Sequence, residues 1–63
     1  MTTYRCFCLT TDNRIIAGAH IRAPDVLTAV EVARDDWQTT AGFHSIEVWF
    51  GHTRLFPPAK AGG

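Results

Sequence analysis

Residues 25–41 carry the one clear helical pattern of the chain. Apolar residues recur there at the spacing of a single helix face, made of Val26, Ala29, Val30, Ala33 and Trp37. Asp25 directly precedes this run, so its carboxylate is placed to cap the free N–H groups of the first turn. Gly42 suits the left-handed position that ends many helices. The pattern therefore predicts one helix over about residues 25–41.

The other apolar segments are short and alternate with polar residues, as β-strands do. They cover residues 4–9, 14–21, 45–49 and 53–56. Asp12-Asn13 is a turn signal that joins the first two into a hairpin, and Gly51 lies in a turn between the last two. The order β-β-α-β-β predicts an α+β two-layer sandwich. One helix packs on one face of a mostly antiparallel four-stranded sheet, in the order strand 2, 1, 3, 4.

The alternation also predicts which strand residues face the helix. We assign the helix side to Ile15, Ala17, Ala19, Ile21, Ile46 and Val48. The opposite sheet face then has no covering layer, and its expected residues are Arg5, Phe7, Leu9, Ile16, His20, Glu47 and Trp49. Exposed apolar patches of this kind mark interaction sites. We therefore expect an interface formed by Phe7, Ile16, His20 and Trp49.

Length and charge narrow the possible functions. The 63 residues suffice for one small domain, expected over residues 1–56, with a flexible tail over residues 57–63. The six basic residues are scattered singly and balance six acidic ones, which argues against a nucleic-acid partner. No apolar run is long enough to span a membrane. We expect a cytoplasmic protein without a membrane partner.

Reactive side chains form no recognisable catalytic or cofactor motif. Cys6 and Cys8 lie two residues apart on a predicted strand, where we expect reduced, buried thiols. A zinc site that combines them with His20, His44 and His52 is an alternative, although the cysteine spacing is not that of a zinc knuckle. His44 and His52 together could also form a weak metal site. We expect no cofactor, no resident metal and no enzymatic activity.

Two resemblances add expectations to this interpretation. The C-terminal Gly62-Gly63 resembles the end of ubiquitin-like modifiers and sulfur carriers of the β-grasp fold, which implies a carrier role through that end. Tyr4-Arg5, Ala23-Pro24-Asp25 before an alanine-rich helix, and Ile46-Glu47-Val48-Trp49 resemble a group of small uncharacterised alphaproteobacterial proteins. That second resemblance covers nearly the whole domain and implies a bacterial origin but no activity.

These observations favour a non-enzymatic protein-interaction module. It would function as a homodimer or as an accessory subunit, so its partner is a second copy or another protein. So short a chain is only marginally stable on its own, and self-association commonly stabilises such domains. The alternatives are a modifier or sulfur carrier acting through Gly62-Gly63, and a weak metal-binding protein.

Overall fold

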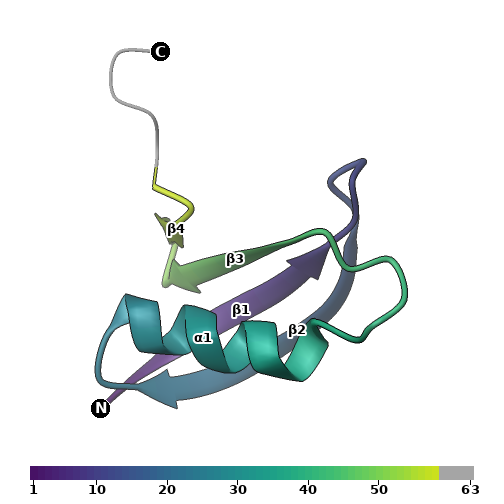
Figure 1. Cartoon of the computed structure of the whole chain (residues 1–63). Coiled ribbons are helices and arrows are strands. Elements are labelled where there is room, and N and C mark those ends of the chain that lie inside the picture. Colours follow the sequence, from purple (N-terminus) through teal and green to yellow (C-terminus); the bar gives the residue numbers. More distant parts are fainter. Residues whose placement is uncertain (59–63) are drawn as a thin grey trace.

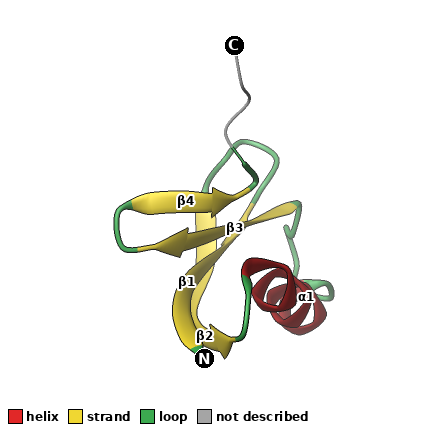
Figure 2. Ribbon diagram, turned by 90° about the vertical axis from the view of Figure 1, so that its left-hand side faces the viewer, coloured by secondary structure: helices red, strands yellow, loops and turns green. Residues whose placement is uncertain are grey.

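The computed structural model describes residues 1–58, and its elements follow the predicted order. They are β1 (Thr2–Leu9), β2 (Ile15–Ala23), α1 (Val26–Trp37), β3 (Ser45–Phe50) and β4 (Thr53–Phe56). All strand pairs are antiparallel, and the sheet order is β2-β1-β3-β4. Helix α1 lies against one face of the sheet (Figure 1), and Figure 2 shows it on one side of the sheet only. The predicted α+β sandwich and strand order are confirmed.

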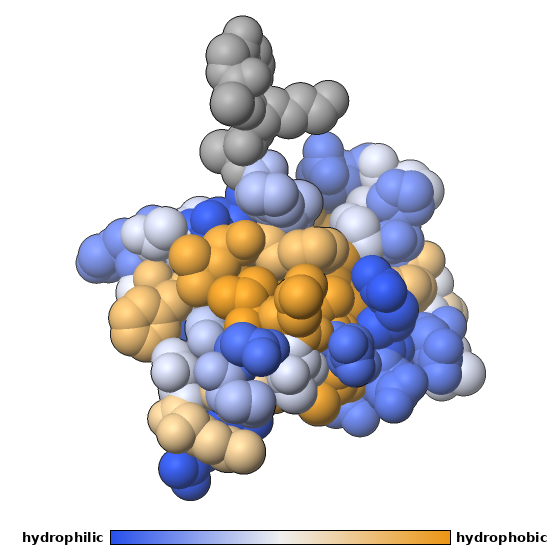
Figure 3. All heavy atoms as spheres, turned by 60° about the vertical axis from the view of Figure 1, so that its left-hand side comes forward, coloured by the Kyte–Doolittle hydropathy of each residue, from blue (hydrophilic) through white to orange (hydrophobic). Residues whose placement is uncertain are grey.

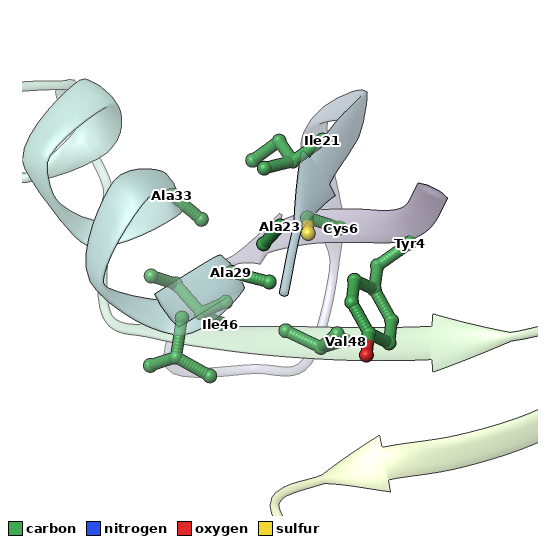
Figure 4. Close-up of a cluster of buried hydrophobic side chains, with 9 residues drawn as sticks. Tyr4, Cys6, Ile21, Ala23, Ala29, Ala33, Ile46 and Val48 are labelled. Atoms are coloured by element: carbon green, nitrogen blue, oxygen red, sulfur yellow. The ribbon is translucent and has the colours of Figure 1, made fainter. Parts of the chain in front are cut away.

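The core lies between α1 and the central strands β1 and β3. Alternate residues of β1 point into it, and they meet alternate residues of β3 in register: Cys6 pairs with Val48, and Cys8 with Ile46. Figure 4 shows Ala29 and Ala33 of the helix facing these strands. The small alanine side chains let the helix approach the sheet closely, and both are fully buried. The predicted apolar face of the helix is the face that packs on the sheet.

The helix begins as predicted but ends earlier. The backbone N–H of Thr28 donates to Oδ1 of Asp25 at 2.8 Å, which is an N-cap bond. The helix ends at Trp37, because Thr39 and Thr40 are weak helix formers and a turn begins there. Gly42 is therefore not the residue that ends the helix. Gly42 instead lies in the loop before β3. Its φ is 88°, and its backbone passes close to Thr10 and Ile16.

An irregularity in β2 changes which residues face the helix. Cys8 pairs with Ala17 but Leu9 pairs with Ile15, so Ile16 is an extra residue, a β-bulge. The alternation therefore shifts by one residue at this point. Ile15, predicted to face the helix, is 60% exposed. β1 stays in regular register with β3, with Leu9 opposite Ser45, so Leu9 keeps its predicted side of the sheet and is nevertheless buried. Simple alternation fails here because polarity does not reveal a bulge.

Candidate interaction surface

The sheet face opposite α1 combines aromatic rings with positive charge. The strand register sets one row of residues across it: His20 of β2 pairs with Arg5, Arg5 pairs with Trp49, and Trp49 pairs with Arg54. A second row places Phe7 between Gly18 and Glu47. Arg22 pairs with Thr3 and lies two residues beyond His20, so it belongs to the same face. We call this set the open face: Arg5, Phe7, Gly18, His20, Arg22, Glu47, Trp49 and Arg54.

Arg5 is held at the centre of the open face by two contacts. Its Nη2 donates to the carbonyl oxygen of Gly51 at 3.0 Å, which ties β1 to the β3–β4 turn. Its guanidinium carbon lies 5.9 Å from the centre of the Phe7 ring, within the range of a cation–π contact. The cation is therefore fixed over an aromatic surface while its residue remains exposed.

A shallow cavity opens beside this pair. It has a volume of about 280 Å³ and is lined by Arg5, Phe7, Gly18, Ala19 and His20. The absence of a side chain at residue 18 leaves room for the Phe7 ring, since a Cβ there would lie 3.3 Å from Cδ1 of Phe7. The lining offers an aromatic face, a guanidinium and an imidazole, which suits a small acidic or aromatic group.

A polar network covers the other half of the open face. The indole Nε1 of Trp49 donates to Oε1 of Glu47 at 3.0 Å. The second oxygen of that carboxylate, Oε2, lies 3.7 Å from Nη1 of Arg54. Because Trp49 has its polar atom satisfied within the chain, its ring is oriented and half-buried rather than free.

Charge is divided between the two faces of the molecule. Three arginines lie on the open face, with Glu47 as its one carboxylate among the described residues. Glu31, Asp35 and Asp36 lie on exposed positions of α1, beside the single cation Arg34. A net charge of zero thus conceals a positive sheet face and a negative helix face. The scattered positions of Arg5, Arg22 and Arg54 in the sequence gave no signal of this, because strand register brings them together.

The structure brings three of the four predicted interface residues onto one face. Phe7, His20 and Trp49 lie on the open face, with Phe7 and Trp49 half-buried and His20 exposed. Ile16 does not join them. As the bulge residue it lies near the loop before β3, with its Cδ1 3.5 Å from the Cβ position of residue 42. The open face is consequently more polar and more cationic than the sequence predicts.

A second apolar surface was missed by sequence reasoning. Figure 3 shows apolar side chains gathered where the helix adjoins β3 and β4. Leu55 and Phe56 pack against the core there but are only partly buried, and Phe50 is 54% exposed. Phe50 touches Tyr4 edge to face, with ring centres 6.2 Å apart. The β3–β4 pairing has a bulge between Val48 and Trp49, and Leu55 is its extra residue. The bulge therefore places one more apolar side chain at this end of the sheet.

Within the described residues, the cysteines and histidines do not come together in a group that could hold a metal ion. Both thiols are free and fully buried, and burial raises the pKa of Cys6 and of Cys8. His44 precedes β3 and His52 follows it, so the six-residue strand separates the two histidines that were expected to form a weak metal site together. Within residues 1–58, no group of three potential ligands is close enough to hold a metal ion.

Two further predictions concern the chain's surroundings and its end. In the described part of the chain, no helix has the length and apolar character needed to cross a membrane. Gly62-Gly63, which carry the predicted modifier or sulfur-carrier role, lie outside the described residues.

The chain matches no family model, no curated protein and no solved structure. The two resemblances in its sequence therefore stay predictions.

Proposed function

We propose that this chain is a small non-enzymatic protein-interaction module whose binding surface is the open face. It would work as an accessory subunit or as a homodimer that presents this face to another protein. The observation that carries the proposal is the division of charge, which concentrates arginines around Phe7 and Trp49. Aromatic and arginine side chains are the residues enriched at protein interfaces. Their partner would be an acidic protein segment, because the charges are then complementary.

The arrangement of the face favours a protein over a nucleic acid. The carboxylate of Glu47 contacts both Trp49 and Arg54 on this face, so a phosphate backbone there would meet a like charge. An acidic peptide can place an apolar or aromatic residue beside Phe7 and its carboxylates at Arg5 and Arg22. The cavity beside Phe7 offers space for such a side chain.

Titration of the isotopically labelled protein with a glutamate-rich peptide tests the proposal by NMR. We expect shifts of the Trp49 indole N–H and of the amides of Arg5 and His20, with affinity that falls as salt rises. Arg5→Ala should weaken binding several-fold. Arg14→Ala is the matched control, because Arg14 lies in the hairpin turn and pairs with Asp12.

Two results would count against this function. Absence of shifts on the open face at millimolar peptide would remove the acidic-partner proposal. Tighter binding of a single-stranded oligonucleotide of equal charge, on the same residues, would identify a nucleic acid as the partner instead.

A further inference from the structure

The two edges of the sheet are protected to very different degrees. The edge strand β4 has four residues, contains the bulge beside Val48 and is followed at once by Pro57-Pro58. Short length, bulges and prolines are the features that prevent an edge from pairing with another strand. The other edge strand, β2, is the longest strand of the sheet and contains no proline or lysine. Its own bulge, at Ile16, lies near its start, and from Ala17 to Ala23 its pairing with β1 is regular.

The unpaired main-chain groups of β2 can be assigned from the neighbouring strand. The N–H of His44 donates to the carbonyl oxygen of Leu9 at 2.9 Å, so that carbonyl points away from β2. The N–H of Thr10 donates to the carbonyl oxygen of Arg14, so it points to the β2 side of β1. This is expected, because successive residues of a strand direct their main-chain groups to opposite sides. Main-chain groups of Cys6 and Tyr4 therefore point toward β2 and bond with Ala19 and Ile21. It follows that the N–H and C=O groups of Gly18, His20 and Arg22 point outward along the open edge.

Side chains leave this edge accessible. Ala19 lies on the helix side of the sheet and is nevertheless exposed, so the helix leaves the middle of the edge uncovered while it buries Ile21 and Ala23. Gly18, Ala17 and Ala19 are small and cannot shield the main chain. Two large apolar residues at the start of the strand, Ile15 and Ile16, are 60% and 42% exposed. The edge thus has the free hydrogen-bonding groups and exposed apolar surface on which a further strand can pair.

We propose that β2 pairs antiparallel with β2 of a second copy of this chain, about a two-fold axis at His20. The regular segment from Ala17 to Ala23 has His20 at its midpoint, so this register pairs all of it. The outward groups of His20 then bond with those of the other copy's His20, and Gly18 bonds with the other copy's Arg22. A two-fold axis makes the strand its own complement, because both copies present the same outward groups.

Charge argues for this register and against its neighbour. An axis at Gly18 would place Arg22 directly opposite Arg14 of the other copy, a destabilising pair of like charges. The axis at His20 places Arg22 opposite a glycine and no two arginines opposite each other. The sheet then continues through both copies with both helices on the same side, so the two open faces join into one surface. The pairing rests on the homodimer of the proposed function and gives it a geometry, but it does not depend on an acidic partner.

Sedimentation and amide hydrogen exchange of the full chain test the pairing. We expect a species of twice the chain mass at high concentration, with the amides of Gly18, His20 and Arg22 protected from exchange. His20→Lys should return the protein to a monomer, because two like charges then face each other across the axis. His20→Gln is the matched control and should leave the dimer intact.

His20→Pro gives a second, independent measurement. Proline lacks the N–H that points outward from residue 20 toward the second copy. The substitution should therefore remove the pairing of copies while the hydrogen bonds between β1 and β2 remain. A monomer at all concentrations, or freely exchanging amides at Gly18, His20 and Arg22 within a dimer, would overturn the inference. Peptide titration of the wild-type protein at a concentration too low for pairing separates the two proposals, because the expected shifts at Arg5 and Trp49 require only the open face of one copy.

Discussion

The ring of Phe7 lies over Gly18, close enough that a Cβ at residue 18 would come within 3.3 Å of Cδ1 of Phe7. The pair faces solvent on the open face and forms part of the cavity lining. A glycine in the middle of a strand normally weakens it. Here the aromatic ring of the neighbouring strand covers the exposed backbone, so the two residues act as one unit.

Substitution of this glycine should therefore reveal its coupling to Phe7. Gly18→Val forces the ring to move, and we expect a loss of about 1 kcal/mol in the free energy of unfolding. In a Phe7→Ala background the same substitution should be neutral or stabilising, because valine favours strands and no longer meets the ring. Urea denaturation of the wild type, the two single variants and the double variant measures the coupling. Equal effects in both backgrounds would show that the ring is free to move.

The Trp49–Glu47–Arg54 network predicts a difference between two substitutions of one residue. Glu47→Gln keeps an acceptor for the Trp49 indole and loses only the partly exposed ion pair with Arg54, so it should cost less than about 0.5 kcal/mol. Glu47→Ala also loses the indole's acceptor and should cost about 1 kcal/mol. Urea denaturation gives both values, and the indole N–H resonance reports the bond. An unchanged indole resonance in Glu47→Ala would contradict the assignment.

The N-cap predicts a contribution to stability that depends on pH. The hydrogen bond from the Thr28 backbone holds the pKa of Asp25 below its usual value. A carboxylate with a lowered pKa in the folded state stabilises the protein above its unfolded-state pKa, and this stability is lost as pH falls through the folded pKa. Asp25→Ala should thus lower the urea midpoint at pH 7 and have less effect in strong acid. Asp25→Asn, which retains a capping oxygen without the charge, is the control.

The elements that sequence predicts well are those in which one physical pattern dominates. Ile46 and Val48 alternate with Glu47 and Trp49 without interruption, and their faces in β3 are as predicted. The spacing that places Ala29 and Ala33 on one side of the helix leaves no alternative face for the core. Both patterns are reliable because an element that is buried on one side must repeat its apolar residues at the fixed interval of its secondary structure.

Other features depend on contacts that no local pattern contains. The bulge at Ile16 leaves the apolar sequence unchanged and still reverses the side of Ile15. β2 continues to Ala23, beyond the predicted end of the strand at residue 21, and this extension brings Arg22 onto the open face. The cationic character of that face follows from strand register, which polarity along the chain does not specify. That β2 lies at an edge of the sheet likewise follows only from the sheet order.

The buried thiols give a last prediction, about reactivity. Cys6 and Cys8 lie fully inside the core, and burial raises the pKa of both thiols. A raised pKa keeps the thiols protonated when folded, while the unfolded chain ionises at about pH 8.5. Stability should therefore fall as pH rises above that value.

In native conditions a thiol reagent should react with both cysteines only as fast as the fold opens. Urea should accelerate the reaction in step with unfolding. Cys6→Ser should cost about 1–3 kcal/mol, because it places a hydroxyl without a partner among Ala19 and Val48, which pair with this position. Cys6→Ala, which adds no polar atom, is the control. Rapid native labelling of Cys6 would instead mean that the core between β1 and the helix opens readily, and that a functional thiol has to be considered.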